Sequence, residues 1–238
     1  MCGRYTFTKP ADAMVSQFQM LISPDAPARY NIAPGQMVLI VRETLSKSGP
    51  VIEPAEVKWG LVPSWAKDAS IANKLINARA ETLAEKPAFR YAYKNRRCLI
   101  PADGFYEWQT VSKMKIPFYI HLKSKEPFAF AGLWETWERS EGYLQTCTIV
   151  TTAANNILRP LHERMPVILP IHLYKDWLSH NTPPDRLNDM LLPYPENRMD
   201  LFAVGDYVSQ VKYEGPGLIE PRPFDAGDQA IEEQLSLF

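Results

Sequence analysis

The sequence lacks the features that mark several specialised classes of protein. It has three cysteines in 238 residues, at positions 2, 98 and 147, without CxxC spacing, so neither a disulfide framework nor a zinc site is predicted. No apolar run reaches the roughly 18 residues of a membrane span, and the start MCGRYTF lacks the regions of a secretory signal. We therefore expect a cytoplasmic protein with no membrane partner, metal or cofactor.

Charge is nearly balanced overall but is unevenly distributed. There are 26 basic and 27 acidic residues, with 46% hydrophobic residues, which excludes a disordered or fibrous chain. Residues 220–238 hold five acids and one base, whereas Arg90, Lys94, Arg96 and Arg97 fall within eight positions without an acid. The basic cluster predicts a local phosphate-binding surface. A solvated basic face is an equally good interpretation of the cluster taken alone.

Secondary structure is expected to be dominated by short strands. Runs rich in β-branched and aromatic residues, separated by Gly, Pro and Asp, predict paired strands. These runs are Met37–Arg42, Val57–Leu61, Arg97–Pro101, Gly104–Gln109, Pro117–Leu122, Phe128–Trp134 and Gln145–Thr151. Helices are expected at 8–22, 80–93, 154–161, 171–179 and 184–191. Because strands and helices do not alternate regularly, the predicted fold class is α+β and not a doubly wound sheet.

The residue after the initiator methionine carries a distinctive chemical possibility. Methionine is normally trimmed when the second residue is small, and trimming would leave Cys2 with a free α-amine beside its thiol. The reference pKa values, about 7.7–8.0 and about 8.5, give both groups reactive populations near neutral pH. This 1,2-aminothiol suits capture of an aldehyde as a thiazolidine, or nucleophilic attack on an amide. On position alone, a chance small residue is the better interpretation.

Further polar residues lie in unusually apolar surroundings. Asn77 lies within LINAR, Glu107 within GFYEW, and His162 within PLHERMP. A partly buried Glu and a His suit proton transfer near neutral pH, and Arg4 offers a fork for phosphate. Taken singly, each has a structural alternative: Asn77 as a turn or cap, Glu107 as an ion pair in a strand, and His162 as a core imidazole.

Six segments together resemble one known family. They are Met1–Arg4, Tyr30–Gly35, Trp59–Trp65, Asn77–Thr82, Arg97–Trp108 and Leu161–Leu169. In this order they resemble the SRAP (SOS-response-associated peptidase) family, whose members capture abasic sites in DNA. The resemblance implies a single SRAP-like domain over residues 1–219. It further implies mixed, mostly antiparallel sheets with a barrel-like core surrounded by helices.

The resemblance also implies an activity and roles for individual residues. The protein would bind single-stranded DNA and capture an abasic-site aldehyde as a thiazolidine crosslink through Cys2, within the SOS response to DNA damage. Asn77 would hold the amine and sugar, Glu107 would move protons, and His162 would assist sugar opening and the reverse reaction. The implied DNA-binding residues are Arg4, Asn31, Pro34, Trp65, Arg79, Thr151 and Arg164. The family's label implies self-processing peptidase activity, and the imine chemistry allows AP lyase activity.

Residues 220–238 are predicted to form a flexible acidic tail that ends in a second motif. Gln234, Leu235, Leu237 and Phe238 resemble the peptide with which bacterial replication proteins dock on the sliding clamp. The alternative is an amphipathic tail that folds back on its own core. The clamp and abasic single-stranded DNA are thus the predicted partners of a nucleoid-associated monomer. Two rival functions are an N-terminal Cys-nucleophile peptidase or amidase, and a non-covalent reader of modified bases or DNA ends.

Overall fold

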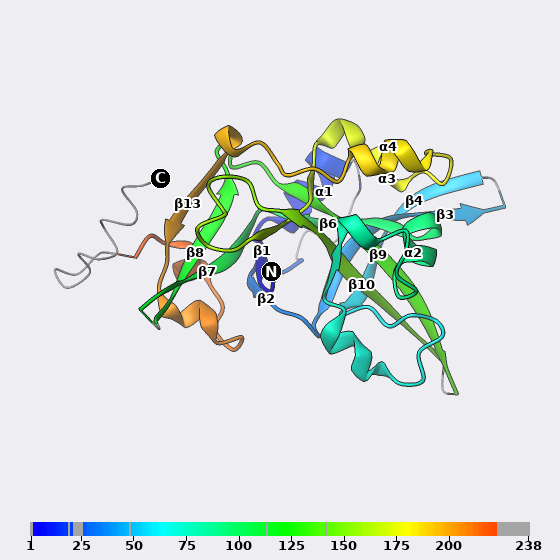
Figure 1. Ribbon diagram of the computed structural model, residues 1–238, viewed down its shortest axis with the longest axis horizontal. Coiled ribbons are helices and arrows are strands. Elements are labelled where there is room, and N and C mark those ends of the chain that lie inside the picture. Colours follow the sequence, from blue (N-terminus) through cyan, green and yellow to red (C-terminus); the bar gives the residue numbers. More distant parts are fainter. Residues whose placement is uncertain are drawn as a thin grey trace.

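Two β-sheets make up most of the fold (Figure 1). The computed structural model describes residues 2–18, 20, 26–47, 49–112, 114–140 and 142–222, so most of the predicted tail and its clamp-binding peptide lie outside the described residues. One sheet has five strands. In spatial order they are β13 (Met199–Ala203), β8 (Met114–Leu122), β7 (Gly104–Val111), β1 (Tyr5–Phe7) and β2 (Arg29–Ile32).

The second sheet contains a closed barrel. Five of its strands pair in a ring, because β10 pairs with both β4 and β9. The ring consists of β10 (Gly142–Ala153), β4 (Gly49–Trp59), β3 (Met37–Ser46), β6 (Arg97–Ala102) and β9 (Phe128–Arg139). Three short strands extend it: β5 (Asn77–Arg79) and β11 (Arg164–Pro166) pair with β10, and β12 (Ile168–Leu169) pairs with β9.

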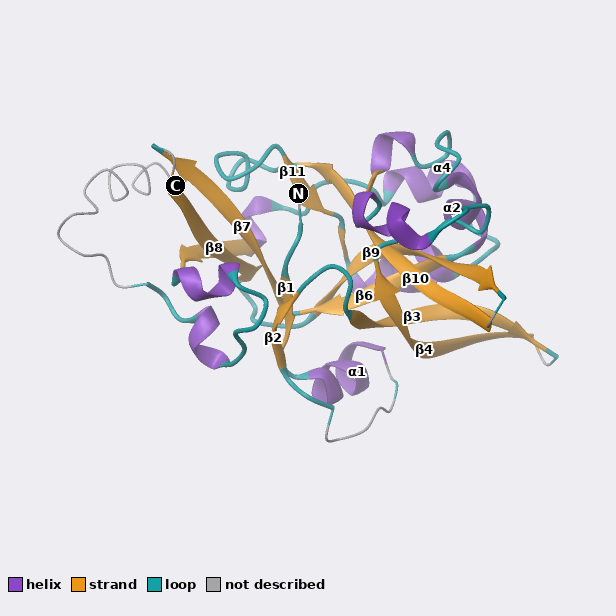
Figure 2. Cartoon of the chain, turned by 90° about the horizontal axis from the view of Figure 1, so that it is seen from below, coloured by secondary structure: helices purple, strands orange, loops and turns teal. Residues whose placement is uncertain are grey.

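One hydrophobic core joins the two sheets. In Figures 1 and 2, β1 lies near the middle of the molecule, on the side of the five-stranded sheet that meets the barrel. Its Tyr5 ring meets the rings of Trp59 and Phe130 edge-on, with centroids 5.4 and 5.8 Å away. All three side chains are at most 1% exposed. Edge-to-face contacts of buried rings stabilise such packing beyond the area they bury, so this cluster fixes the start of the chain against the barrel.

The strand predictions are confirmed, and most of the strands are longer than expected. Each of the seven predicted runs falls within or overlaps β3, β4, β6, β7, β8, β9 or β10. The α+β class with mostly antiparallel pairing and a barrel-like core is also confirmed. Six further strands, β1, β2, β5, β11, β12 and β13, were not predicted, because two to five residues are too few to show alternation.

Helices are few and short, and they lie around the sheets (Figure 2). The expectations at 171–179 and 184–191 are confirmed by α3 (Tyr174–Leu178) and α4 (Pro184–Asp189). The prediction at 8–22 is confirmed only over α1 (Pro10–Phe18), and residues 19 and 21–25 lie outside the described part. Within the described residues, no helix is long and apolar enough to cross a membrane.

Two predicted helices are wrong. Residues 80–93 begin as a 3-10 helix, Ala80–Thr82, continue as turns, and become helical again only in α2 (Arg90–Asn95). Pro87 explains the break, because it offers no N–H for a helical hydrogen bond. Residues 154–161 form turns, in which the Leu158 N–H donates to the side-chain oxygen of Asn155 at 3.2 Å. This is the bond of a helix N-cap, but the turns end at Leu161 without continuing as a helix.

The basic cluster is not one surface. Arg97 is 3% exposed, and its guanidinium donates to four backbone carbonyls at 2.6–2.8 Å. Arg96 forms an ion pair with the buried Glu135. Arg90 and Lys94 are exposed. The prediction that all four residues lie on the surface is therefore wrong for Arg97. Its guanidinium is buried, where it donates hydrogen bonds to carbonyls at the ends of α2 and α3.

Removing the Arg97 guanidinium tests how much it stabilises the fold. Arg97→Met should lower the free energy of unfolding by about 3 kcal/mol, because buried carbonyls of Tyr93, Trp177 and Ser179 lose their donor. Urea unfolding measures the change as a shift in midpoint at constant slope. The control is Arg198→Met, which removes an exposed arginine. Equal midpoints for the two variants would contradict this account.

Candidate active site

Strand pairing places Cys2 beside Glu107. Tyr5 of β1 pairs with Phe105 of β7, and the Tyr106 N–H donates to the Arg4 carbonyl at 2.9 Å. This antiparallel register carries the chain before β1 along β7 toward Glu107. Cys2 is 1% exposed and belongs to the core cluster. Residue 2 is thus held in a buried position and not at a fraying end.

Asn77 contacts the main chain of Cys2 directly. It begins β5, where it pairs in parallel with Ile149 of β10. Its Nδ2 donates to the Cys2 carbonyl at 2.8 Å. Its Oδ1 is buried and has no hydrogen-bond partner among the described residues. A buried unpaired acceptor is costly, so this oxygen is suited to receive a donor such as an amine.

Glu107 and His162 form an acid–imidazole pair. The Glu107 side chain is 8% exposed, and its Oε1 lies 3.9 Å from His162 Nδ1. The Arg164 N–H donates to His162 Nδ1 at 3.0 Å, so the neutral ring carries its proton on Nε2. Both residues line a cavity of about 490 Å³, together with Trp108, Leu161 and Ser209. The geometry brings together the four residues predicted for catalysis.

Burial changes the chemistry expected of the thiol. Desolvation raises the pKa of Cys2 to about 12, and the negative charge of Glu107 adds to the rise. In this chain, in which Met1 precedes Cys2, the thiol therefore keeps its proton at neutral pH. The reactivity expected of Cys2 after trimming stays a prediction. Across the described part of the chain, no group of three or more His, Cys, Asp or Glu could hold a metal ion.

Arg4 is held by hydrogen bonds that reach the C-terminal part of the described chain. Its Nη1 donates to Asn31 Oδ1 and to the Val208 carbonyl, both at 2.7 Å. Asn31 is fully buried, and its Nδ2 donates to the carbonyls of Gln210 and Tyr213. Asn31 therefore positions Arg4 and the segment around residue 210. It has no exposed surface with which to line a strand channel.

Arg164 is also held within the protein. Its two terminal nitrogens donate to the Glu81 carboxylate at 2.6 and 2.9 Å, and Nη2 donates to the Thr151 carbonyl at 2.6 Å. This pairing lowers the pKa of Glu81. The predicted DNA-binding residue Thr151 is fully buried. The sequence analysis did not predict that Glu81 pairs with Arg164. The only signal was an acidic residue two positions after Arg79, within the segment Asn77–Thr82.

The remaining predicted DNA-binding residues face outward to different degrees. Trp65 is 59% exposed, and Arg79 is exposed at the end of β5. Pro34 is half-buried in the turn after β2. Among these three residues, Arg79 follows Asn77 by only two positions in the same strand. The exposed members of the set are therefore the ones available to a ligand.

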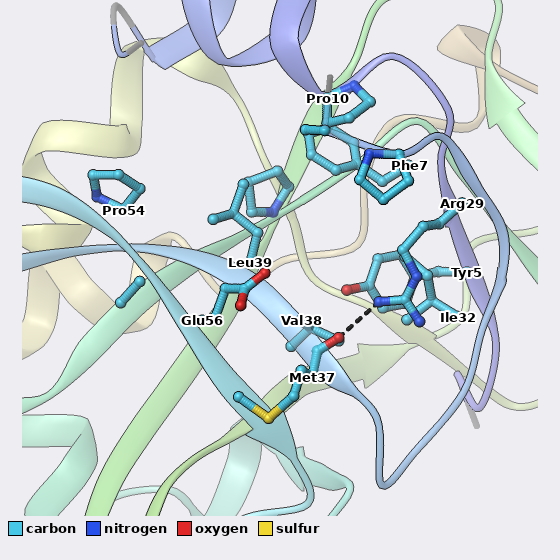
Figure 3. A pocket seen from close by; sticks show the side chains of 14 residues that line it. Tyr5, Phe7, Pro10, Arg29, Ile32, Met37, Val38, Leu39, Pro54 and Glu56 are labelled. Carbon is cyan, nitrogen blue, oxygen red and sulfur yellow. Dashed lines mark hydrogen bonds between the residues drawn. The ribbon is translucent and has the colours of Figure 1, made fainter. Parts of the chain in front are cut away.

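Another cavity is lined by residues other than the four at Cys2 (Figure 3). It has a volume of about 550 Å³ and is mostly apolar, with Phe7, Leu39 and Pro54 among its lining residues. Arg29 in its wall already has a hydrogen-bond partner within the protein, since its Nη1 donates to the Met37 carbonyl at 2.7 Å. None of the four residues at Cys2 lines it.

Comparison with known proteins points to one family. Residues 1–211 match the family model described as SOS response associated peptidase (SRAP). The chain is 46% identical to the abasic site processing protein YoqW of Bacillus subtilis, over 92% of this chain and 99% of that one. It is 29% identical to the abasic site processing protein YedK of Escherichia coli, over 93% and 100%. A crystal structure from Bacteroides thetaiotaomicron has the same fold, with a TM-score of 0.83 at 23% identity, and covers 93% of this chain and 100% of its own.

The raised thiol pKa has a direct chemical readout. In protein that retains Met1, Cys2 should react with iodoacetamide at about pH 8 at least a hundredfold more slowly than in the urea-denatured chain. Below the folded pKa of about 12, the rate should keep rising about tenfold per pH unit. Mass spectrometry of the N-terminal peptide measures both rates. A plateau near pH 9 would contradict the raised pKa.

Proposed function

The chain belongs to the SOS response associated peptidase family, and on that premise we propose that it processes abasic sites by covalent capture. In this proposal it binds single-stranded DNA, and mature Cys2 condenses with the aldehyde of the base-free deoxyribose. The product is a thiazolidine crosslink that shields the lesion. The observation that carries the proposal is the burial of Cys2 among Asn77, Glu107 and His162.

The proposal requires removal of Met1. In the sequence as printed, the Cys2 nitrogen is part of a peptide bond, which is not nucleophilic. Trimming converts it to an α-amine with a reference pKa of about 7.7–8.0. The unpaired Oδ1 of Asn77 is suited to accept a hydrogen bond from this amine, while Nδ2 keeps the Cys2 carbonyl in place. Asn77 would thereby orient the nucleophile.

Amine attack comes before sulfur attack in this mechanism, because the thiol holds its proton. The neutral amine adds to the aldehyde carbon and gives a carbinolamine. Glu107 moves one proton from nitrogen to oxygen as the carbinolamine forms, and it then delivers a second proton, taken up from solvent, to the hydroxyl, which leaves as water. The product is an iminium ion. Its positive charge lies next to the thiol and lowers the thiol pKa, which offsets part of the effect of burial.

Ring closure then completes the crosslink. The Cys2 sulfur adds to the iminium carbon, and its proton leaves by way of Glu107, giving a five-membered ring that is neutral at nitrogen. Overall, amine, thiol and aldehyde give a thiazolidine and one water, with no change in oxidation state. Because the sulfur and nitrogen belong to one residue, closure is intramolecular and rapid. The same steps in reverse release the DNA.

His162 has a place next to the sugar in this scheme. Its Nδ1 accepts the Arg164 N–H, which leaves the Nε2–H as a donor in the neutral ring. A donor at this point would assist opening of the deoxyribose hemiacetal to the aldehyde. Trp65 and Arg79, both exposed, would stack on a base and contact a phosphate. Clamp docking through residues 234–238 stays a prediction from the sequence.

The rival functions receive less support. A peptidase that uses the Cys2 thiol as its nucleophile needs a thiolate, whereas burial raises the pKa of this thiol to about 12. A non-covalent reader gives no reason for a buried acid beside residue 2, or for the unpaired oxygen of Asn77. Strand cleavage through the same iminium ion remains compatible with the proposed chemistry.

Crosslinking should require both the amine and the thiol of Cys2. Protein with Cys2 as its first residue should give a heat-stable shifted band with single-stranded DNA from which uracil has been excised, on a denaturing gel. Protein that keeps a cleavable extension before Cys2 should give none until it is cleaved. Cys2→Ser should give a band only after borohydride reduction, because an imine forms but no ring closes. Crosslinking by the uncleaved protein would contradict the mechanism.

Glu107 should affect the rate of capture more than DNA affinity. Glu107→Gln removes the proton carrier while keeping the side-chain size, so the crosslinking rate should fall about a hundredfold. Affinity for undamaged single-stranded DNA should stay within roughly twofold. Glu138→Gln, at an exposed position of β9, is the matched control. Equal loss of rate and affinity would make Glu107 a structural residue.

A further inference from the structure

A second hollow in the surface is lined by two exposed aromatic side chains. Trp65, in the loop after β4, is 59% exposed, and Tyr91, in the first turn of α2, is 53% exposed. Together with Ser64, Pro87 and Arg90 they line a hollow of about 480 Å³. Exposed aromatic side chains that gather around one hollow are typical of a binding surface, because each alone would be better buried.

Both sides of the hollow are held in place. The Trp65 Nε1–H donates to the Pro87 carbonyl at 3.3 Å, which connects the loop after β4 to the segment before α2. One residue further on, the Ala66 carbonyl accepts the Trp137 Nε1–H from β9 at 2.8 Å. The indole is therefore anchored at its polar edge while its ring stays exposed. Such a ring loses little conformational freedom when a ligand stacks on it.

Tyr91 is supported from within the protein. The Arg96 guanidinium lies 5.2 Å from the centroid of the Tyr91 ring, in cation–π contact. Arg96 is fixed in turn by its ion pair with Glu135 and by the ring of Trp134. The tyrosine ring thus rests on a fixed cation although more than half of its surface is open. The ring is therefore held in place by Arg96 while its other surface is open to a ligand.

The charge of the hollow is positive. Arg90 lines it, and no acidic residue does among the described residues. Residues 86–94 carry Lys86, Arg90 and Lys94, all exposed, and no acid. Of the basic cluster expected from the sequence, Arg90 and Lys94 are exposed, and Lys86 adds a third exposed cation. Aromatic rings beside an unpaired cation suit a flat base joined to a phosphate.

We propose that this hollow is a nucleobase subsite for the DNA strand that carries the abasic site. A base flanking the lesion stacks on Tyr91 and Trp65, and Arg90 contacts its phosphate. The inference rests on the proposed function and deepens it, since it assigns Tyr91 and Arg90 to the substrate. The occupant is a base of single-stranded DNA, because neither an apolar peptide nor an acidic one needs two exposed rings beside one cation.

The chain connects this hollow to the residues at Cys2. The segment from Gly60 to α2 begins where the Gly60 N–H donates to the Cys147 carbonyl of β10, and it passes through Asn77 beside Cys2. Exposed Arg79 follows Asn77, and the hollow follows with Pro87 and Tyr91. Trp65 comes before Asn77 in this segment and Tyr91 comes after it, so one continuous segment carries the hydrogen bond to Cys2, an exposed cation and both sides of the hollow.

The test measures stacking at a defined base. The probe is single-stranded DNA without a lesion, carrying 2-aminopurine at successive positions, and the protein is the full chain. Tyr91→Ala should weaken binding about tenfold and restore the fluorescence of one 2-aminopurine position, whereas Tyr91→Phe should behave like the original protein. Arg90→Gln should reduce the slope of log affinity against log salt by about 1. Thermal unfolding shows that each variant is folded.

Two controls separate this site from a general surface effect. Ile171→Ala removes an apolar side chain that is also 53% exposed, and Arg198→Gln removes an exposed arginine next to β13, which lies at the opposite end of the molecule from α2 in Figure 1. Neither should change affinity or fluorescence. If Tyr91→Ala and Ile171→Ala bind alike and quench 2-aminopurine alike, the subsite is overturned.

Crosslinking distinguishes this inference from the proposed function. Failure of the original protein to crosslink abasic DNA would overturn covalent capture. The subsite would still stand if binding of undamaged DNA depended on the Tyr91 ring. Normal crosslinking together with unchanged base stacking in Tyr91→Ala would overturn the subsite alone. Tyr91→Phe separates loss of the ring from loss of the hydroxyl, since only loss of the ring should matter.

Discussion

The hydrogen bond from Asn77 to the Cys2 carbonyl, made possible by the pairing of β1 with β7, is the constraint on which the site depends. Residues near the start of a chain normally fray, and a buried main-chain carbonyl is costly without a donor. Here the barrel supplies the donor through β5, and the five-stranded sheet supplies the neighbouring strand. The site at Cys2 therefore exists only where the two sheets meet.

Burial at this junction sets the order of chemical events. A Cys2 exposed to solvent would offer a partly ionised thiol, which would attack many electrophiles. At 1% exposure beside a carboxylate, the thiol stays protonated until a positive charge forms next to it. In the proposed capture, an iminium ion on the same residue provides that charge. In this account the site is selective for aldehydes because only an aldehyde converts the amine into the group that activates the sulfur.

The sequence was informative about local pattern and about chemistry, and less so about long-range partners. Seven strands followed from runs of β-branched and aromatic residues, and apolar surroundings drew attention to Asn77, Glu107 and His162 before their roles were implied by the family resemblance. The burial of Asn31 did not follow, because the carbonyls that bind it lie 179 and 182 residues away. Arg97 was misread for the same reason, since its partners include carbonyls of Trp177 and Ser179.

The nature of the bond at the aldehyde carbon tests the central claim most directly. Single-stranded DNA with a ¹³C label at C1′ of the abasic deoxyribose can be mixed with protein that begins at Cys2, and the carbon observed by NMR. The account predicts a saturated carbon bonded to both nitrogen and sulfur, which persists after removal of excess DNA. A carbon that remains an imine, or one that stays bonded to oxygen alone, would contradict capture by the paired amine and thiol of Cys2.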